Sequence, residues 1–273
     1  MNKITSRDNP KLKHARKVRD GKEPTEIFIE GSRLAEETVR SGHDINSVFV
    51  SSGFGNPGRE AELVNKLERL GVAIYQVDDK ILQSVADTKN TQGIVLISRR
   101  SDTSYERFAK DFSARCRAPV VFLNKINNPS NLGAILRTAE AAGVAEVIVS
   151  NDSTDVFSPK ALRASMGSSL RLNIWENAAF EDVIRWARKK GMLATAADIG
   201  ADKFYTEIDW TKPRLLVFGS EADGLSAGEL AQIDEQIKIP MENGVESLNL
   251  AVSCGIILYE AKRQRDSTGS RST

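Results

Sequence analysis

The sequence predicts an α/β protein of two domains, the second built on a parallel sheet. Apolar strand-like runs alternate with amphipathic helical patterns along most of the 273 residues, which favours strands covered by helices on both faces. Two such stretches flank a polar connector. We therefore expect a small α/β domain at 1–100, a linker at 101–117, a larger domain at 118–265 and a flexible tail at 266–273.

The first domain is expected to be a layer of helices on a sheet. An apolar run at 27–30 predicts a strand that leads through Gly31 into a helix ending at Gly42. The other expected elements are strands at 48–50, 73–75 and 94–97 and a helix at 59–70.

The second domain has a more regular alternation. Helical patterns lie between most of its apolar runs, which is typical of a doubly covered parallel sheet. The expected strands lie at 120–123, 147–149, 193–196, 215–218 and 237–239.

Composition narrows the possible partners. The net charge is +1 with 27% charged residues, so a nucleic acid would have to bind a local basic patch. Cys116 and Cys254 lie far apart, which fits a reducing cytosol. The sequence contains neither an apolar run of membrane-spanning length nor a signal-peptide core, so we expect a cytoplasmic protein without a membrane partner.

Three loops of the second domain join a strand to a polar or helix-starting segment. They span 128–133, 218–225 and 239–249, and each gathers backbone donors and small polar side chains. Unpaired N–H groups and the helix dipole favour electron-rich ligands at such places. Three loops of this kind on one sheet suggest a single composite site.

The first loop opens a helix. Pro129 suits its first turn, with Asn128 or Ser130 as the cap. Arg137 lies off the buried stripe of this helix, so it is either a solvated surface residue or a group that reaches a phosphate or a developing oxyanion. The stripe is expected to consist of Leu132, Ile135, Leu136 and Ala139.

The residues of the other two loops argue against a phosphate-binding loop and a dinucleotide-binding site. Leu225 stands where a phosphate-binding loop needs lysine, and no GxGxxG motif opens a helix after a strand. Glu221, in the second loop, can accept hydrogen bonds from a ligand. In the third loop Ser247 and Asn249 are both good caps, but capping accounts for only one of them.

Other catalytic machinery is missing from the pattern. His14 and His43 both lie in the first domain, which excludes a Ser-His-Asp arrangement in the second. No group of His, Cys, Asp and Glu has metal-ligand spacing, so we expect no metal.

In this order the three loops closely resemble the motifs of the SpoU (TrmH-type) branch of the SPOUT RNA methyltransferases. The resemblance covers about 120–260, and 158–167 is similar to the family's intervening segment. Residues 30–34 carry a weaker match to the family's substrate-binding domain, which is similar to ribosomal proteins that bind kinked RNA. The chain departs from the pattern at Asn128, where Asp is usual, and at Ala222, where Gly is common.

The resemblance implies S-adenosylmethionine-dependent 2′-O-methylation of a ribose in RNA, a deep trefoil knot and a homodimer. Ribosomal RNA is the expected substrate, and transfer RNA is the alternative. A non-catalytic RNA-binding protein is the rival from another class, and the intact polar positions argue against it. The resemblance implies that the cofactor is held by Gly219, Ile239 and Leu248, and that the polar active-site residues are Asn131, Arg137, Glu221, Ser247 and Asn249. Because a free guanidinium, with a pKa above ~12, is a poor base, we favour Arg137 as a phosphate clamp and alkoxide stabiliser.

A basic run at the start of the chain predicts where RNA binds. It stands out in an otherwise neutral sequence, and a solvated helix face is the alternative interpretation. The expected RNA-binding residues are Arg7, Lys11, Lys13, Arg16, Lys17 and Arg33.

Overall fold

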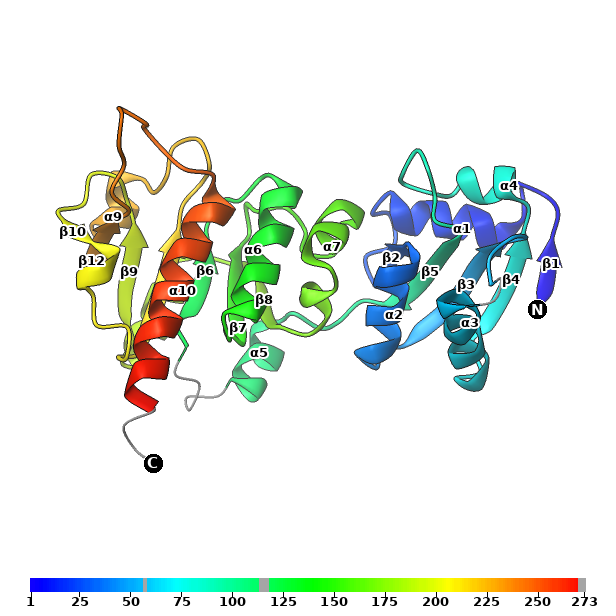
Figure 1. Ribbon diagram of the computed structural model, residues 1–273, viewed down its shortest axis with the longest axis horizontal. Coiled ribbons are helices and arrows are strands. Elements are labelled where there is room, and N and C mark those ends of the chain that lie inside the picture. Colours follow the sequence, from blue (N-terminus) through cyan, green and yellow to red (C-terminus); the bar gives the residue numbers. More distant parts are fainter. Residues whose placement is uncertain (56–57, 113–117, 270–273) are drawn as a thin grey trace. The chain divides into compact units, whose positions relative to one another are not determined.

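The computed structural model describes residues 1–55, 58–112 and 118–269 (Figure 1). Contacts divide the chain into two compact units. The first comprises Met1–Ser101 and Asp155–Arg171, and the second comprises Asp102–Thr154 and the chain from Leu172 onward. Cys116, one of the two cysteines, lies outside the described residues.

The first unit is built on a mixed sheet with the strand order β1-β4-β3-β5-β2. The pairs β1–β4 and β4–β3 are parallel, whereas β5 runs antiparallel to β3 and β2. Every strand and helix expected between 27 and 97 is present, and β1 and two helices add to them. The strands are β1 (Asn2–Ile4), β2 (Glu26–Glu30), β3 (Ile45–Ser51), β4 (Ala73–Val77) and β5 (Ile94–Arg99), and the helices are α1 (Pro10–Arg19), α2 (Ser32–Arg40), α3 (Arg59–Arg69) and α4 (Asp79–Gln83).

The segment Asp155–Arg171 belongs to the first unit by its contacts, although it lies late in the chain. It contains α7 (Pro159–Ser165) and a short 3₁₀ helix. Two ion pairs hold it within this unit, Arg163 to Asp87 and Arg171 to Glu37, each at 2.6 Å. By its contacts this segment groups with the first unit, although it lies within the region 118–265 that the sequence predicts as one domain.

The second unit confirms the predicted parallel sheet. Its order is β10-β12-β9-β11-β6-β7-β8, and every strand pair is parallel. The expected strands are present, while β8 and β10 were not expected. The strands are β6 (Val120–Leu123), β7 (Glu146–Ser150), β8 (Asn173–Ala178), β9 (Leu193–Ala197), β10 (Lys203–Phe204), β11 (Arg214–Phe218) and β12 (Glu235–Lys238).

Helices cover this sheet, and two of them differ from the expected boundaries. The expected linker contains α5, whose Phe108 is fully buried 5.9 Å from the Trp175 ring, so this part of the connector belongs to the second unit. Helix α10 continues to Gly269, beyond the expected start of a flexible tail at 266. The helices are α5 (Tyr105–Asp111), α6 (Pro129–Ala141), α8 (Phe180–Lys189), α9 (Ala227–Leu230) and α10 (Leu250–Gly269).

Helix α6 forms where the sequence predicts it. The Asn128 side chain accepts a hydrogen bond from the Ser130 nitrogen at 2.9 Å, and Pro129 occupies the first turn. The predicted stripe is fully buried, and α10 packs beside α6 (Figure 1). The motif that follows β6 is therefore fixed to the sheet and to the last helix.

A buried arginine offers a test of this unit's stability. Arg214 is 3% exposed and donates to Thr195, Glu235 and the Asp209 carbonyl oxygen. Because removal of one partner leaves buried polar groups unpaired, we expect Arg214→Met to lower the free energy of unfolding by about 3 kcal/mol. Urea unfolding followed by tryptophan fluorescence measures this, since all three tryptophans lie in the second unit.

Arg185→Met is the control for this prediction. Arg185 is exposed on α8 and pairs only with the neighbouring turn through Asp182 at 2.8 Å. Such surface pairs contribute little, so the change is expected to stay within about 0.5 kcal/mol. Equal effects of the two substitutions would contradict a structural role for the buried guanidinium.

Candidate active site

The three polar loops meet at the carboxyl edge of the second unit's sheet and line one pocket of about 520 Å³. Parallel strands end at the same edge, so the segments after β9, β11 and β12 converge there. All but one of the residues predicted for catalysis and cofactor binding line this pocket. They are Asn131, Gly219, Glu221, Ile239, Ser247, Leu248 and Asn249.

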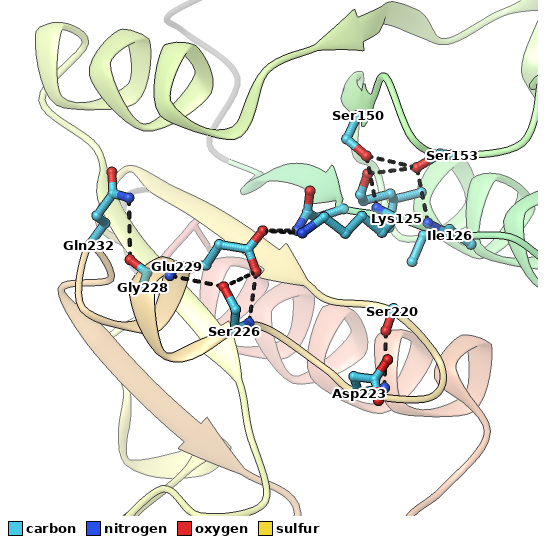
Figure 2. Close-up of polar contacts among 12 residues, drawn as sticks. Lys125, Ile126, Ser150, Ser153, Ser220, Asp223, Ser226, Gly228, Glu229 and Gln232 are labelled. Atoms are coloured by element: carbon cyan, nitrogen blue, oxygen red, sulfur yellow. Dashed lines mark hydrogen bonds and ion pairs between the residues drawn. The ribbon is translucent and has the colours of Figure 1, made fainter.

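The second loop is a tight turn closed by its own backbone. Ser220 and Gly224 exchange two N–H to carbonyl bonds, each 3.1 Å long, and the Asp223 nitrogen donates to Ser220 Oγ at 3.0 Å (Figure 2). A Cβ at Gly219 would meet the carbonyl group of Gly224 and lie 2.5 Å from the Leu225 nitrogen. Glycine is therefore required here by the turn itself.

Glu221 joins the second loop to the first. Its carboxylate accepts hydrogen bonds from the backbone nitrogens of Asn127 and Asn128 and from Asn131 Nδ2, each at 3.3 Å. Three donors, two of them backbone groups, thus converge on one exposed side chain. Glu221 therefore connects the second loop to the first through these hydrogen bonds.

Asn249 joins the third loop to the first. Its Oδ1 accepts from the nitrogens of Ala251 at 3.0 Å and Val252 at 3.4 Å, which caps α10. Its Nδ2 donates to Asn131 Oδ1 at 3.1 Å. Of the two predicted caps, Asn249 takes the capping position, and Ser247 instead lines the pocket.

Arg137 lies apart from these residues. It is exposed on α6 and is not among the residues that line the pocket. It follows Asn131 by six positions, which places it about 240° further round the helix. Within one chain, therefore, the described structure does not bring Arg137 to the site where the other predicted residues meet.

The predicted RNA-binding residues lie in the first unit, on or near α1 and α2. Lys11 lies over the Tyr75 ring at 4.8 Å, and Arg33 is exposed at the start of α2. The Arg16 guanidinium donates to the Arg7 carbonyl oxygen at 2.9 Å and to Ser84 at 3.3 Å, so it has a structural role.

Two of the lysines in this run also have acidic neighbours. Lys13 lies 3.3 Å from Asp8, and Lys17 lies 3.8 Å from Glu23. Each of these lysines is more than half exposed, and such pairs break at little cost. Both lysines therefore stay available to bind RNA, and their role in RNA binding stays a prediction.

The sequence did not single out several residues of the pocket. Asp198 and Ile199 directly follow β9, and Lys238 and Met241 flank Ile239. The signal was present, because a residue just after a buried parallel strand lies at the ligand-binding edge. The sequence predicts the strand at 193–196, and Asp198 lies two residues beyond its end.

The pocket is negatively charged. Four carboxylates line it beside the ammonium of Lys238, together with neutral polar side chains and with apolar side chains at the ends of β9, β11 and β12. Such a lining suits a positively charged ligand with an apolar ring, which is the character of S-adenosylmethionine, and repels a nucleoside triphosphate. The carboxylates are Asp198, Glu221, Asp223 and Glu246.

Two further expectations concern absent features. Among residues 1–55, 58–112 and 118–269, no three or more His, Cys, Asp and Glu side chains are grouped to hold a metal ion. None of the helices in the described part of the chain is long and apolar enough to cross a membrane.

Cys254 is buried, which raises the pKa of its thiol and makes it unreactive.

The parallel sheet with its three-loop pocket, preceded by a separate α/β unit, is the arrangement of an RNA-modifying methyltransferase. A family model described as the SpoU rRNA Methylase family matches residues 118–259, and one described as RNA 2′-O ribose methyltransferase substrate binding matches residues 28–103. The chain belongs to the SpoU rRNA methylase family. It is an RNA 2′-O-ribose methyltransferase that uses S-adenosylmethionine.

Individual relatives extend over nearly the whole chain. An uncharacterized tRNA/rRNA methyltransferase of Synechocystis is 32% identical and covers 96% of this chain and 94% of its own length. The 23S rRNA (guanosine-2′-O-)-methyltransferase RlmB of Vibrio cholerae is 32% identical, and the match covers 85% of this chain and 98% of the relative. An AdoMet-bound rRNA methyltransferase from Sinorhizobium meliloti superposes with a TM-score of 0.83 at 29% identity, covering 96% and 97%.

The turn at Gly219 gives a prediction for cofactor binding. Gly219→Ala places a methyl group against the backbone of Gly224 and Leu225, so the backbone of this loop, which lines the pocket, must shift. We expect the affinity for S-adenosylmethionine to fall at least tenfold, as measured by calorimetry. Gly228→Ala is the control, because a Cβ there has nothing within 4 Å and lies in α9. Unchanged affinity in Gly219→Ala would refute this account of the loop.

Proposed function

We propose that this protein methylates the 2′-hydroxyl of one ribose in ribosomal RNA. The observation that carries the proposal is the joining of all three loops into one negatively charged pocket by the bonds of Asn131, Glu221 and Asn249. The RlmB relative, named for guanosine methylation in 23S rRNA, supports the large-subunit RNA as substrate. The match of residues 28–103 to a substrate-binding family supports a role for the first unit in holding that RNA.

Three residues are proposed to hold the cofactor, whose role is to supply a methyl group already activated on a positively charged sulfur. Ile239 and Leu248 offer apolar surfaces for the adenine ring, and the backbone at Gly219 offers close polar contact. The surrounding carboxylates favour the positive charge of the sulfonium group. The pocket's volume of about 520 Å³ is in the usual range for such ligands.

The remaining polar residues are proposed to orient the ribose. Asn131 and Asn249 are bonded to each other at 3.1 Å, so their amides have fixed positions, and Ser247 lines the same pocket. Orientation of two reacting groups can lower a barrier by ~7–11 kcal/mol in favourable cases. In this proposal the residues of the pocket act mainly by placing the hydroxyl in line with the methyl group.

Arg137 is proposed to act across a homodimer. It is exposed on α6, which packs beside α10, and Val252 and Tyr259 are about half exposed on α10 at the i, i+7 spacing of one helix face. A second copy that covers this surface would bury the apolar side chains and bring Arg137 to the pocket of its partner. There a guanidinium would bind a substrate phosphate and stabilise the developing alkoxide.

The proposal includes two further features of the family resemblance. One is a deep trefoil knot, supported by the return of α10 from the end of β12 to the side of α6, near the middle of the sheet. The other is a cytoplasmic location, where a bacterial ribosome is assembled. The negative charge of the pocket and the proposed chemistry require neither feature.

Transfer of a labelled methyl group tests the function. Purified protein is incubated with labelled S-adenosylmethionine and with ribosomal or transfer RNA from cells that lack the gene. Label at one ribose of ribosomal RNA is the expected result. Label in transfer RNA alone would move the substrate to the other RNA class, and RNA binding without transfer would favour the non-catalytic alternative.

Replacement of Arg137 separates chemistry from cofactor binding. Arg137→Ala is expected to reduce kcat at least a hundredfold, because the phosphate clamp is lost, and to leave the affinity for S-adenosylmethionine within threefold, because Arg137 lies outside the pocket of its own chain. Rates at saturating substrate and calorimetry measure the two effects. Arg185 is exposed on α8, so Arg185→Ala is the matched control and should retain full activity.

Mixing the two variants tests the dimer, at a concentration of S-adenosylmethionine too low to saturate Gly219→Ala. If Arg137 serves the partner's pocket, mixed dimers of Arg137→Ala and Gly219→Ala chains contain one intact site and regain activity. Absence of any regained activity in refolded mixtures would contradict the shared site.

Charge reversal tests RNA binding by the first unit. Replacement of Lys11, Lys13 and Lys17 by glutamate is expected to weaken RNA binding at least tenfold and to flatten its salt dependence, because fewer counterions are released. Arg16 is left intact because of its structural bonds. Affinity over a salt series is the measurement. The control reverses Lys66, Arg69 and Lys80, which are also exposed, and equal effects would show that α1 is only a solvated face.

A further inference from the structure

The loop between β6 and α6, residues 124–128, is held through each of its five backbone nitrogens. Each donates to a group from another part of the second unit, so the loop depends on its surroundings for its conformation. Figure 2 shows the bonds of Lys125 and Ile126 to Ser150 and Ser153. The acceptors, in chain order, are the Phe218 carbonyl oxygen (2.8 Å), Ser150 Oγ (2.8 Å), Ser153 Oγ (3.0 Å) and, for the last two nitrogens, the Glu221 carboxylate (both 3.3 Å).

The first two side chains of this loop converge on Glu229 in α9. Glu229 Oε1 accepts from Asn124 Nδ2 at 2.9 Å and from Lys125 Nζ at 2.8 Å. Its Oε2 accepts from the Ser226 nitrogen at 2.7 Å and from Ser226 Oγ at 2.8 Å (Figure 2). Glu229 is only 8% exposed, so all four donors reach a carboxylate that is almost out of solvent.

The surroundings of Glu229 keep it ionised. Burial opposes its charge, but the hydrogen bonds from Lys125, Ser226 and Asn124 outweigh burial and lower its pKa to about 2. Lys125 in turn has a positive φ of 60°, a strained conformation for a residue with a side chain. Such a conformation persists where several contacts impose it, as they do here.

We propose that Glu229 is a positioning residue for methyl transfer, which ties the 124–128 loop to α9 and thereby fixes the start of α6. This inference rests on the proposed function. Glu229 does not line the pocket, but Asn131 does, and it lies in the first turn of the helix that this loop begins. Glu229 accepts a hydrogen bond from Asn124 at one end of the loop, and Glu221 accepts from the two residues at the other end. The segment 221–229 therefore holds both ends of the loop.

A second ion pair of the same unit provides a matched control. The Glu235 carboxylate is also mostly buried and accepts from Arg214 and from Lys203 Nζ, the latter at 3.1 Å. Burial opposes its charge too, and these bonds lower its pKa. Glu235 begins β12, so it lies at the opposite edge of the sheet from the pocket.

The experiment compares Glu229→Gln with Glu235→Gln in the full-length protein. Both are expected to lower the melting temperature of the second unit, since both lose a buried charge pair. Only Glu229→Gln is expected to reduce kcat at least tenfold, while the dissociation constant for S-adenosylmethionine stays within threefold. Equal kcat values in the two folded variants would overturn the proposal.

Hydrogen exchange supplies a measurement that does not depend on activity. The amide protons of Asn127 and Asn128 should exchange at least tenfold faster in Glu229→Gln than in Glu235→Gln, because the other end of their loop is released. Equal exchange would overturn the positioning role even if the variants differ in rate. Absence of methyl transfer by the wild type, with the exchange difference intact, would refute the proposed function and leave the role of Glu229 in the loop standing.

Lys125→Met tests the same link from its other side. The Lys125 side chain is 43% exposed, and in this variant Glu229 keeps its bonds to Asn124 and Ser226, so the fold should be retained even where Glu229→Gln fails to fold. Loss of the ion pair is expected to reduce kcat at least threefold, with unchanged affinity for S-adenosylmethionine. A wild-type kcat in folded Lys125→Met would overturn the link through this pair.

Discussion

The arrangement of the site depends on one requirement, that the backbone nitrogens of the 124–128 loop find acceptors outside the loop. Asn124 and Ile126 are buried, and buried N–H groups that lack an acceptor cost about as much as a lost hydrogen bond, so this part of the loop can form only where others supply oxygens. Ser150 and Ser153 supply two from the end of β7, and Glu221 supplies two from the second motif. The first motif is therefore shaped by segments far from it in the chain, and the motifs act as one unit.

The two glutamates of the 221–229 segment show how one residue type serves two environments. Glu229 is buried and has four donors, so its charge is neutralised locally by an ammonium and by dipoles. Glu221 is exposed at the pocket and contributes its charge to the lining with Asp198, Asp223 and Glu246. The negative field that suits a sulfonium cofactor thus comes from the exposed carboxylates, while the buried one holds the loop in place.

The sequence predicted what depends on local periodicity, and it missed what depends on distant contacts. The buried stripe of α6 and the capping of α10 by Asn249 follow from helix period and cap chemistry, and the structure confirms both. Strand β8 was missed because Asn173, Glu176 and Asn177 break its apolar pattern. Asn124 and Lys125, which bond to Glu229, lie more than 100 residues from it in the chain, and a local sequence pattern cannot predict a contact over that separation. Likewise, the helix period placed Arg137 off the stripe without revealing that it lies outside the pocket.

The use of Glu221 in holding the loop has a consequence for the chemistry. The Glu221 carboxylate accepts from Asn127, Asn128 and Asn131, so its two oxygens are already used to hold the first loop. The neutral amides of Asn131 and Asn249 cannot take up a proton at neutral pH. The pocket of a single chain therefore offers orientation and a negative field rather than a strong base. That would be sufficient for a methyl donor that is already a cation, because the carbon–sulfur bond would break as the bond from the ribose oxygen to carbon forms, and the hydroxyl proton would pass to water. The demand placed on the protein is then geometric, and the rigidity of the 124–128 loop is the property that meets it.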